Sequence, residues 1–439
     1  MADSRSAALT VLEKCRRAGA WSDAVLGSVM DAAALEGRDR ALAAALCYGV
    51  MQNRILLDHI IAQCATMPLQ RMEPKVLDIL RLAAFQLLKM DRVPAAAAVN
   101  SAVQQSKQLG YARAAGFVNA VLRRISKGDY AIPEGKSAEA LSIRCSHPLW
   151  FVQRMMELLG SRETELLLEA NNTPVPITLQ ANTRKTDTKT LINALLSQGL
   201  DAEAHPYLPD CILLKSGSVR AIPEFGQGKF YIQDAAAKMA VLAAAPETGW
   251  RILDVCAAPG GKSFAAAILS GGAEITACDL HENKLARIRA GAERLGLTDI
   301  STCARDARQS CPEFAGRFDL VIADVPCSGL GVIRKKPDIR YKEPENLSGL
   351  PQIQLAILKN VSAYVRPGGT LLYSTCTVLP EENRGVCSEF LAQTPEFAPE
   401  EFTLPDGIES RSGMLQLWPH RNGTDGFFIA KMRKCRKST

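Results

Sequence analysis

Apolar and polar residues follow one pattern in the N-terminal third of the chain and a different pattern in the rest. From about Ser4 to Lys127 the chain is rich in alanine, leucine, arginine and glutamine, which favour helices, and it contains few glycines and prolines. Apolar residues recur here every three or four positions, for example at Leu77, Leu80 and Ala84. This spacing predicts an all-α domain, a bundle of helices over residues 1–132.

Beyond a linker that contains proline and glycine, the pattern becomes mixed over residues 138–238. The run VPITLQANT alternates apolar and polar residues as a half-buried strand does, and short apolar runs that begin at Cys211 and Lys229 predict further strands. A helical segment lies between them in the sequence. These elements predict a small α+β domain, in which Arg184 and Lys185 could hold RNA, or which could serve as a cap.

From Trp250 onward, strand-like runs alternate with helical segments, which predicts a doubly wound α/β sheet in a domain over residues 239–435. The expected parallel strands lie in RILDVCAAPGGK, EITACDL, ISTCARDAR, LVIADVPCSG and TLLYSTCT. The late run from Gly426 to Met432 suits an antiparallel strand at the edge of the sheet. In such sheets ligands bind beyond the carboxyl ends of the strands, so the turns after the strands are the expected site.

The turn from Asp254 to Lys262 is rich in glycine but matches neither of two common nucleotide-binding loops. A P-loop requires glycine five positions before Gly261, where this chain has Cys256, and the adjacent glycines do not form a G-x-G-x-x-G pattern. The sequence therefore argues against ATP and NAD. The turn can still present a helix N-terminus, together with Lys262, to a carboxylate.

Acidic residues close the next two expected strands. Asp279 lies where a ribose is normally bound, and Asp306 lies where it could accept from an exocyclic amine. Successive strand ends would thus bind a carboxylate, a ribose and an adenine, and S-adenosylmethionine carries these three groups in this order. We therefore expect S-adenosylmethionine as the cofactor; the alternative is a sheet of this type that binds no ligand.

Two cysteines and an acid follow the fourth and fifth expected strands. Asp324 and Cys327 follow the fourth strand and Cys376 follows the fifth. Taken alone, Cys327 would be an ordinary buried cysteine in a turn. Methylation of carbon 5 of a pyrimidine needs a thiolate that attacks carbon 6, an acid near ring nitrogen 3, and a base that removes the proton from carbon 5. The two cysteines and Asp324 can supply these roles.

Composition indicates the kind of partner and the cellular compartment in which this chemistry is expected. The net charge of +6 lies wholly in residues 1–130, which carry 17 Lys and Arg against 11 Asp and Glu. A basic segment favours a polyanion such as RNA as the partner, although a solvated helix face explains so small an excess equally well. The chain has 13 cysteines without a C-x-x-C pair, which argues against disulfides and a zinc site. It also lacks a long apolar run and a signal peptide, so we expect a cytoplasmic protein that does not bind membranes.

Three motifs carry a resemblance to a known family. DVPCSG at residues 324–329 resembles the D-A-P-C-S-G signature of the RNA 5-methylcytosine methyltransferases of the Fmu/Sun (RsmB-like) family, with Val325 where alanine is usual. STCT at residues 374–377, followed by PEEN, and VCAAPGGK at residues 255–262 are similar to two further motifs of that family. The helical runs VPAAAAVNSAVQQSK and GFVNAVLRR resemble the NusB-like RNA-binding domain of its bacterial 16S rRNA members.

The resemblance implies a role for each reacting residue. Cys376 would be the nucleophile, Cys327 would assist proton removal and product release, and Asp324 would contact the cytosine or the cofactor. DNA cytosine methyltransferases attack from the proline-cysteine motif and lack the second cysteine, so Cys376 favours RNA as the substrate. The implied cofactor contacts are Cys256, Ala257, Ala258, Pro259, Gly260, Gly261, Lys262, Asp279, Asp306 and Asp324. The implied fold is a NusB-like bundle, a small α+β domain and a Rossmann-like methyltransferase domain.

The sequence thus predicts a methyltransferase that modifies carbon 5 of one cytosine in 16S rRNA, either free or at an early stage of assembly. The alternatives are a tRNA cytosine-5 methyltransferase and a ribosome-assembly factor that only binds RNA. We expect a monomer without a metal. The residues expected to contact RNA are Arg123, Arg124, Lys127, Arg334, Lys335 and Lys336.

Overall fold

The computed structural model describes residues 3–18, 22–215, 217 and 219–436. By their internal contacts the residues form two compact units. The first comprises Met1–Thr173 with Ile333–Lys342, and the second comprises Pro174–Val332 with Glu343–Thr439. The boundary between Thr173 and Pro174 falls inside the range 138–238 that we expected as one small domain. The bounds of the three expected domains stay a prediction.

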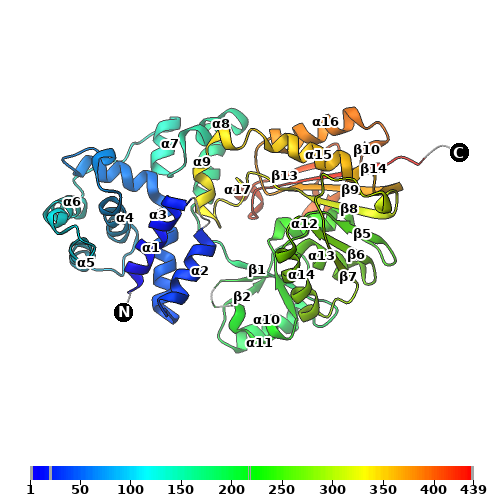
Figure 1. Ribbon diagram of the computed structural model, residues 1–439, viewed down its shortest axis with the longest axis horizontal. Helices are drawn as coiled ribbons and strands as arrows, with labels where there is room; N and C mark the ends of the chain where they lie inside the picture. The colour runs from blue at the N-terminus through cyan, green and yellow to red at the C-terminus, as the bar shows by residue number, and fades with distance from the viewer. Residues whose placement is uncertain (1–2, 19–21, 216, 218, 437–439) are drawn as a thin grey trace. The chain divides into compact units, whose positions relative to one another are not determined.

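The first unit is helical throughout, as the apolar spacing indicated, and is coloured mainly blue to cyan in Figure 1. Its helices are α1 Ser4–Ala18, α2 Ser22–Ala32, α3 Gly37–Cys64, α4 Pro74–Lys89, α5 Ala95–Gln108, α6 Ala115–Lys127, α7 Ala138–Arg144, α8 Leu149–Leu159 and α9 Ser161–Ala170. The helices from α1 to α6 form the core of this unit, in which Ala8, Leu57, Leu80 and Leu122 are completely buried. Burial of these side chains at helical spacing holds the bundle together.

A short segment from the C-terminal half of the sequence completes the helical unit. Residues 337–341 form a 3-10 helix, η5 Pro337–Tyr341, in which Arg340 is completely buried. Its guanidinium donates to the carbonyl oxygens of Gln52 at 2.7 Å and Ser146 at 2.8 Å. Burial lowers the pKa of Arg340 to about 10. Residues 334–336, which we expected in a loop beside the active-site turn, therefore lead into a segment that is built into the helical unit.

The second unit contains a small antiparallel sheet in the strand order β2-β3-β1-β4. Its strands are β1 Ile177–Ala181, β2 Ala202–Ala204, β3 Cys211–Leu214 and β4 Phe230–Ile232, and it packs against α10 Thr188–Ser197. Arg184 donates to Asp299 at 2.9 Å and to the carbonyl oxygen of Ala267 at 2.6 Å. Lys185 donates to the carbonyl oxygens of Gln227 and Arg294, both at 3.1 Å. These cations thus join the small sheet to the rest of its unit.

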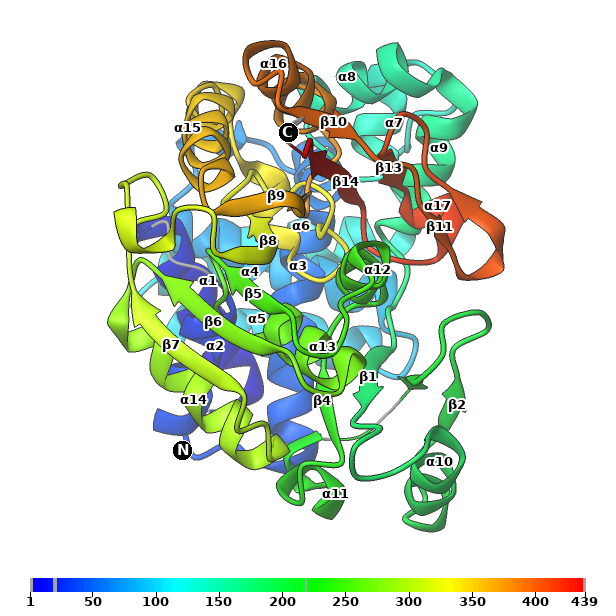
Figure 2. The same ribbon diagram turned by 90° about the vertical axis from the view of Figure 1, so that its right-hand side faces the viewer.

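The larger sheet of the second unit has the strand order β10-β14-β9-β8-β5-β6-β7 (Figure 2). The parallel strands are β5 Arg251–Asp254, β6 Glu274–Asp279, β7 Ile300–Ala304, β8 Phe318–Asp324 and β9 Val365–Thr375. The expected antiparallel strand, β14 Phe427–Lys434, is present, but its expected place at the edge is wrong. It pairs with β9 on one side and with β10 Phe397–Pro399 on the other, and β13 Met414–Leu417 also pairs with it.

Helices cover both faces of this sheet. On one face α12 Ala235–Ala244, α13 Gly261–Ser270 and α14 Glu282–Leu295 pack against alternate strand residues such as Leu320 and Ile322. On the other face α15 Leu350–Ser362 and α16 Val386–Gln393 pack against Val321 and Tyr373. This doubly wound arrangement leaves the carboxyl ends of the parallel strands uncovered for a site. Among the described helices, none is both long and apolar enough to cross a membrane.

Candidate active site

Backbone hydrogen bonds within the loop and to strand β6 fix the shape of the loop between β5 and α13. The N–H of Ala257 donates to the carbonyl oxygen of Cys278, at 2.7 Å, and the N–H of Gly260 donates to that of Ala257, also at 2.7 Å. Gly260 has a φ of +109°, and a Cβ atom there would lie 2.5 Å from the Phe264 ring. Only glycine fits this position, because both the backbone conformation and the ring exclude a side chain. The peptide between Ala258 and Pro259 is cis.

A cavity of about 210 Å³ opens beside this loop. Residues 256–259, Gly261, Lys262 and Asp324 line it, as do Gln233 and Asp254, which we did not expect there. Gly260 shapes the loop without lining the cavity. The expected cofactor residues other than Asp279 and Asp306 are thus gathered at this cavity.

Asp279 and Asp306 end their strands as expected but do not line the cavity. Asp279 accepts the N–H of His281 at 3.1 Å and forms an ion pair with Lys284 at 3.5 Å. Asp306 accepts from the Arg308 guanidinium at 2.7 Å. Hydrogen bonds from this guanidinium lower the pKa of Asp306, so its carboxylate is ionised at neutral pH. The Asp306 carboxylate can therefore accept hydrogen bonds farther along the sheet edge, where Asp279 ends the neighbouring strand β6.

Two buried polar atoms at the cavity have no hydrogen-bond partner among the described residues. One is Oδ1 of Asp254, whose other oxygen accepts from Ser263 at 2.7 Å, and the other is Nε2 of Gln233. Burial raises the pKa of Asp254 to about 7. An unpaired acceptor and an unpaired donor in one cavity fit the ammonium and the carboxylate of an amino acid. Asp254 was detectable as an acid that closes an apolar strand, whereas nothing local in the sequence marks Gln233.

Asp324 is held by residues from two different elements. Its Oδ2 lies 2.7 Å from Nζ of Lys262, at the start of α13, and its Oδ1 accepts from Ser374 at 2.7 Å. Asp324 and Ser374 are partners in the register of the parallel strands β8 and β9. Lys262, which is 8% exposed, thus connects this cavity to the end of β8.

Cys327 and Cys376 lie side by side just beyond the ends of β8 and β9. Their Sγ atoms are 3.3 Å apart. The loop that carries Cys327 is tied to the other by a hydrogen bond from Gly331 N–H to the carbonyl oxygen of Cys376 at 2.9 Å. A hydrogen bond with Cys376 and burial raise the pKa of Cys327 well above its usual value, and the carboxylates of Glu382 and Asp324 act in the same direction. Cys327 is therefore a neutral thiol at neutral pH.

A buried carboxylate joins the two cysteine loops. Glu382, 1% exposed, accepts from the backbone N–H of Ser328 at 2.8 Å and from Nε2 of Gln354 at 2.9 Å. Its other oxygen accepts from Thr377 at 3.2 Å. Ser328 follows Cys327 and Thr377 follows Cys376, so one side chain fixes the neighbour of each cysteine. The sequence shows Glu382 within the PEEN motif but indicates none of its partners.

Comparison with known proteins assigns the chain to a family. Residues 240–433 match the family described as 16S rRNA methyltransferase RsmB/F. Residues 2–127 match the NusB family, and residues 147–220 match the ferredoxin-like domain of RsmF/B-like methyltransferases. The chain is 36% identical, over 98% of its own length and 98% of the relative's, to the "Probable ribosomal RNA small subunit methyltransferase B" of Bacillus subtilis (strain 168). The chain belongs to the RsmB/F methyltransferase family.

Solved structures resemble this RsmB/F-family chain as well. The crystal structure of PH0851 matches with a TM-score of 0.81 and 25% identity, over 98% of this chain and 97% of that one. A methyltransferase homolog protein from Pyrococcus horikoshii matches with a TM-score of 0.60 and 28% identity, over 69% of this chain and 100% of that one. The resemblance to the family and the expected fold class are confirmed, and so is the cofactor: this is an S-adenosylmethionine-dependent methyltransferase.

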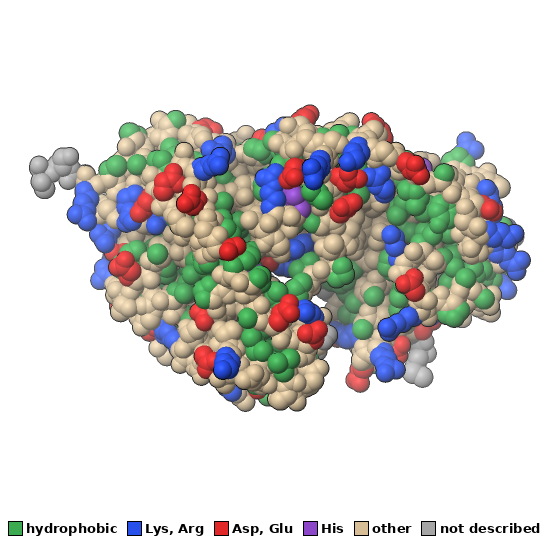
Figure 3. Space-filling model, turned by 180° about the vertical axis from the view of Figure 1, so that it is seen from behind, with side chains coloured by type: hydrophobic (Ala, Val, Ile, Leu, Met, Phe, Trp, Pro, Cys, Tyr) green, Lys and Arg blue, Asp and Glu red, His purple; other side chains and the backbone are tan. Residues whose placement is uncertain are grey.

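The basic residues expected to contact RNA lie at two places in the helical unit of this family member. Arg123 and Lys127 are exposed in the last turns of α6, where Arg124 donates to the carbonyl oxygen of Cys64 at 2.9 Å. Lys336 is exposed, whereas Arg334 and Lys335 are half-buried. Basic and acidic side chains are interspersed on the face of the molecule shown in Figure 3. Contact of these six residues with RNA stays a prediction.

Proposed function

We propose that this RsmB/F-family enzyme transfers the methyl group of S-adenosylmethionine to carbon 5 of a cytosine in 16S rRNA. The observation that carries the proposal is the distance of 3.3 Å between the sulfurs of Cys327 and Cys376, next to a cofactor cavity that Asp324 lines. The family description and the name of the Bacillus subtilis relative support ribosomal RNA as the substrate. The cytosine must leave its base stack to reach both sulfurs.

The first step would form a bond between Sγ of Cys376 and carbon 6 of the cytosine. Attack by the thiolate breaks the double bond between carbons 5 and 6 and leaves carbon 5 electron-rich. Asp324 would hydrogen-bond or deliver a proton at ring nitrogen 3. Lys262, whose Nζ lies 2.7 Å from the Asp324 carboxylate, is placed to supply that proton. Cys327, whose pKa is raised well above its usual value, stays a neutral thiol, which leaves Cys376 as the candidate nucleophile.

Asp254, Gln233 and Lys262 would hold the amino-acid end of the cofactor, with Asp254 accepting from its ammonium and Gln233 donating to its carboxylate. Asp279 and Asp306, farther along the same sheet edge, would accept from the ribose and the adenine. When bound there, S-adenosylmethionine supplies the methyl group to the electron-rich carbon 5.

Product release would require the second cysteine. Once Cys376 is a thioether, its thiol hydrogen bond, the first influence that raises the pKa of Cys327, is gone. Cys327 can then lose its proton to water and remove the proton from carbon 5. The electrons of that bond restore the double bond as the bond between Cys376 and carbon 6 breaks. The proton on ring nitrogen 3 returns to Lys262 by way of Asp324. The net result is the replacement of one proton by one methyl group, with one proton released to solvent.

Methylation of purified RNA tests the proposal. The full chain is incubated with S-adenosylmethionine and with free 16S rRNA, small subunits or tRNA, and bisulfite sequencing then identifies 5-methylcytosine. We expect one modified cytosine in 16S rRNA and none in tRNA. Modification of tRNA alone, or RNA binding without methyl transfer, would replace the proposal by one of the two alternatives. Bisulfite sequencing of rRNA from a deletion strain names the cytosine directly.

A further inference from the structure

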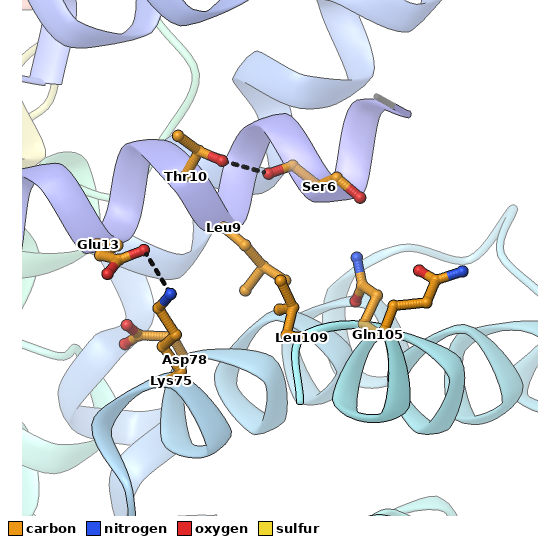
Figure 4. A pocket seen from close by; sticks show the side chains of 9 residues that line it. Ser6, Leu9, Thr10, Glu13, Lys75, Asp78, Gln105 and Leu109 are labelled. Atoms are coloured by element: carbon orange, nitrogen blue, oxygen red, sulfur yellow. Dashed lines mark hydrogen bonds and ion pairs between the residues drawn. The ribbon is translucent and has the colours of Figure 1, made fainter. Parts of the chain in front are cut away.

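A pocket in the helical unit has no part in the chemistry described above. It lies between α1, α4 and the end of α5, and its volume is about 110 Å³ (Figure 4). Leu9 and Leu109 form apolar walls, and Leu109 is 44% exposed at the mouth. Glu13, Asp78 and Gln105 supply polar atoms around these walls. The pocket therefore combines apolar surfaces with hydrogen-bonding groups, as sites for flat heterocycles do.

One hydrogen-bond donor in this pocket lacks a partner. Gln105 is 5% exposed, and its Nε2 has no hydrogen-bond partner among the described residues. A buried amide without a partner destabilises the folded protein. A ligand with an acceptor atom would give this donor a partner. Figure 4 shows the Gln105 side chain at the pocket beside Leu109.

The charges around the pocket restrict what that molecule can be. Asp78 accepts from Arg16 at 3.2 Å and from Arg81 at 3.1 Å, and Glu13 pairs with Lys75 at 3.2 Å. Lys75, the cation among the described lining residues, is already paired with Glu13, so the pocket does not favour a phosphate. A cationic side chain would present only donors, and the unpaired donor of Gln105 would find no acceptor on it. A nucleobase satisfies both conditions, because its edge carries acceptors and donors and its faces are apolar.

We propose that this pocket binds one unstacked nucleobase of the RNA substrate, with an acceptor of the base on Nε2 of Gln105 and its faces against Leu9 and Leu109. The inference rests on the proposed function, which makes RNA the substrate. The pocket volume of about 110 Å³ is below the ~150 Å³ of a cavity that takes up benzene, so the edge of the base enters and the rest stays at the open mouth beside Leu109, which is 44% exposed. Sequence-specific proteins commonly bind RNA through such splayed bases.

Replacement of Gln105 by methionine separates this role from a structural one. Gln105→Met keeps an unbranched side chain and removes the unpaired amide, so the melting temperature of the free protein should stay equal or rise. Affinity for 16S rRNA should fall about tenfold, because the base loses its donor. Gln104→Met, at an exposed neighbouring position of α5, is the matched control and should change neither quantity. A lower melting temperature with unchanged RNA affinity would overturn the proposal.

Nucleoside titrations test the pocket without a requirement for methyl transfer. Cytidine, uridine, adenosine and guanosine are added to the full chain, and the methyl NMR signals of Leu9 and Leu109 are followed. At least one nucleoside should shift these signals in the wild type, and Gln105→Met should weaken the response. No shift with any nucleoside, or a shift only with an arginine amide, would refute the pocket even if 16S rRNA is methylated. Shifts in a protein that does not methylate RNA would instead refute the proposed function alone.

Discussion

The sulfur atoms of Cys327 and Cys376 lie 3.3 Å apart although 49 positions separate the two residues in the chain. Each cysteine follows the carboxyl end of its strand, and β8 and β9 are neighbours in the parallel sheet. Their proximity is therefore a consequence of sheet order. Two thiols at this distance influence each other's protonation, so one can be the thiolate while the other holds a proton.

Exchange of each cysteine for serine should separate their proposed roles. Cys327→Ser should accumulate a covalent complex with 16S rRNA in the presence of S-adenosylmethionine, because the proton on carbon 5 is no longer removed efficiently. Cys376→Ser should form no complex, because the nucleophile is lost. Denaturing gel electrophoresis with labelled RNA measures both, and Cys387→Ser at a buried cysteine of α16 is the control. A complex formed by Cys376→Ser and absent from Cys327→Ser would reverse the two assignments.

Glu382→Gln should impair catalysis through the position of the cysteines. The amide NH2 would face the donors that now bind Glu382, which costs about 1–3 kcal/mol of stability. A displaced cysteine loop should lower kcat by about a hundredfold. Affinity for S-adenosylmethionine, measured by calorimetry, should not change, because Glu382 does not line the cofactor cavity. Glu389→Gln, exposed on α16, is the control, and a loss confined to cofactor affinity would contradict the positioning role.

Asp254→Asn should weaken cofactor binding and stabilise the free protein increasingly as the pH rises above about 4. The pKa of Asp254 is raised to about 7, above its value in the unfolded chain. The folded state therefore binds the proton more tightly, and stability falls as pH rises from about 4 to about 7. The asparagine variant does not lose stability in this way. The difference in unfolding free energy between the variant and the wild type should therefore grow across that pH window, to on the order of 4 kcal/mol at most.

Calorimetry at pH 6 and pH 8 completes this test. In the wild type, S-adenosylmethionine should bind more tightly at pH 8, where Asp254 is ionised and can accept from the ammonium. Binding to Asp254→Asn should be weaker at pH 8 and should lose this pH dependence. Equal affinity of the two proteins at pH 8 would show that Asp254 does not contact the cofactor.

Arg184→Ala should reduce stability without a change in RNA affinity. The Arg184 guanidinium donates to Asp299 and to the carbonyl oxygen of Ala267, so its removal should cost about 1–2 kcal/mol. Thermal unfolding measures that cost. RNA binding at two salt concentrations should match the wild type, because a phosphate contact would alter the salt dependence. Lys189→Ala, exposed on α10, controls for the loss of a positive charge, and a smaller salt dependence for Arg184→Ala alone would assign Arg184 to RNA.

Local patterns in the sequence were sufficient for the fold class and for the positions of the main strands along the chain. Helical spacing gave the bundle, and apolar runs that end in Asp254, Asp279 or Asp324 gave strands whose carboxyl ends meet at one edge. The antiparallel β14 was expected at the edge, but it lies between β9 and β10. The number of neighbours of a strand depends on pairing with remote segments, which its own residues do not encode.

By itself the sequence determined the elements, the family motifs and the cofactor class, because periodicity, turn residues and motif spacing are properties of neighbouring positions. Only the tertiary structure decided which polar groups pair and which stay unpaired. It joins Glu382 to both cysteine loops, leaves Asp254 and Gln233 with unpaired atoms at one cavity, and builds Arg340 into the helical unit. These relationships arise from proximity between distant segments, and that proximity exists only after the chain has folded.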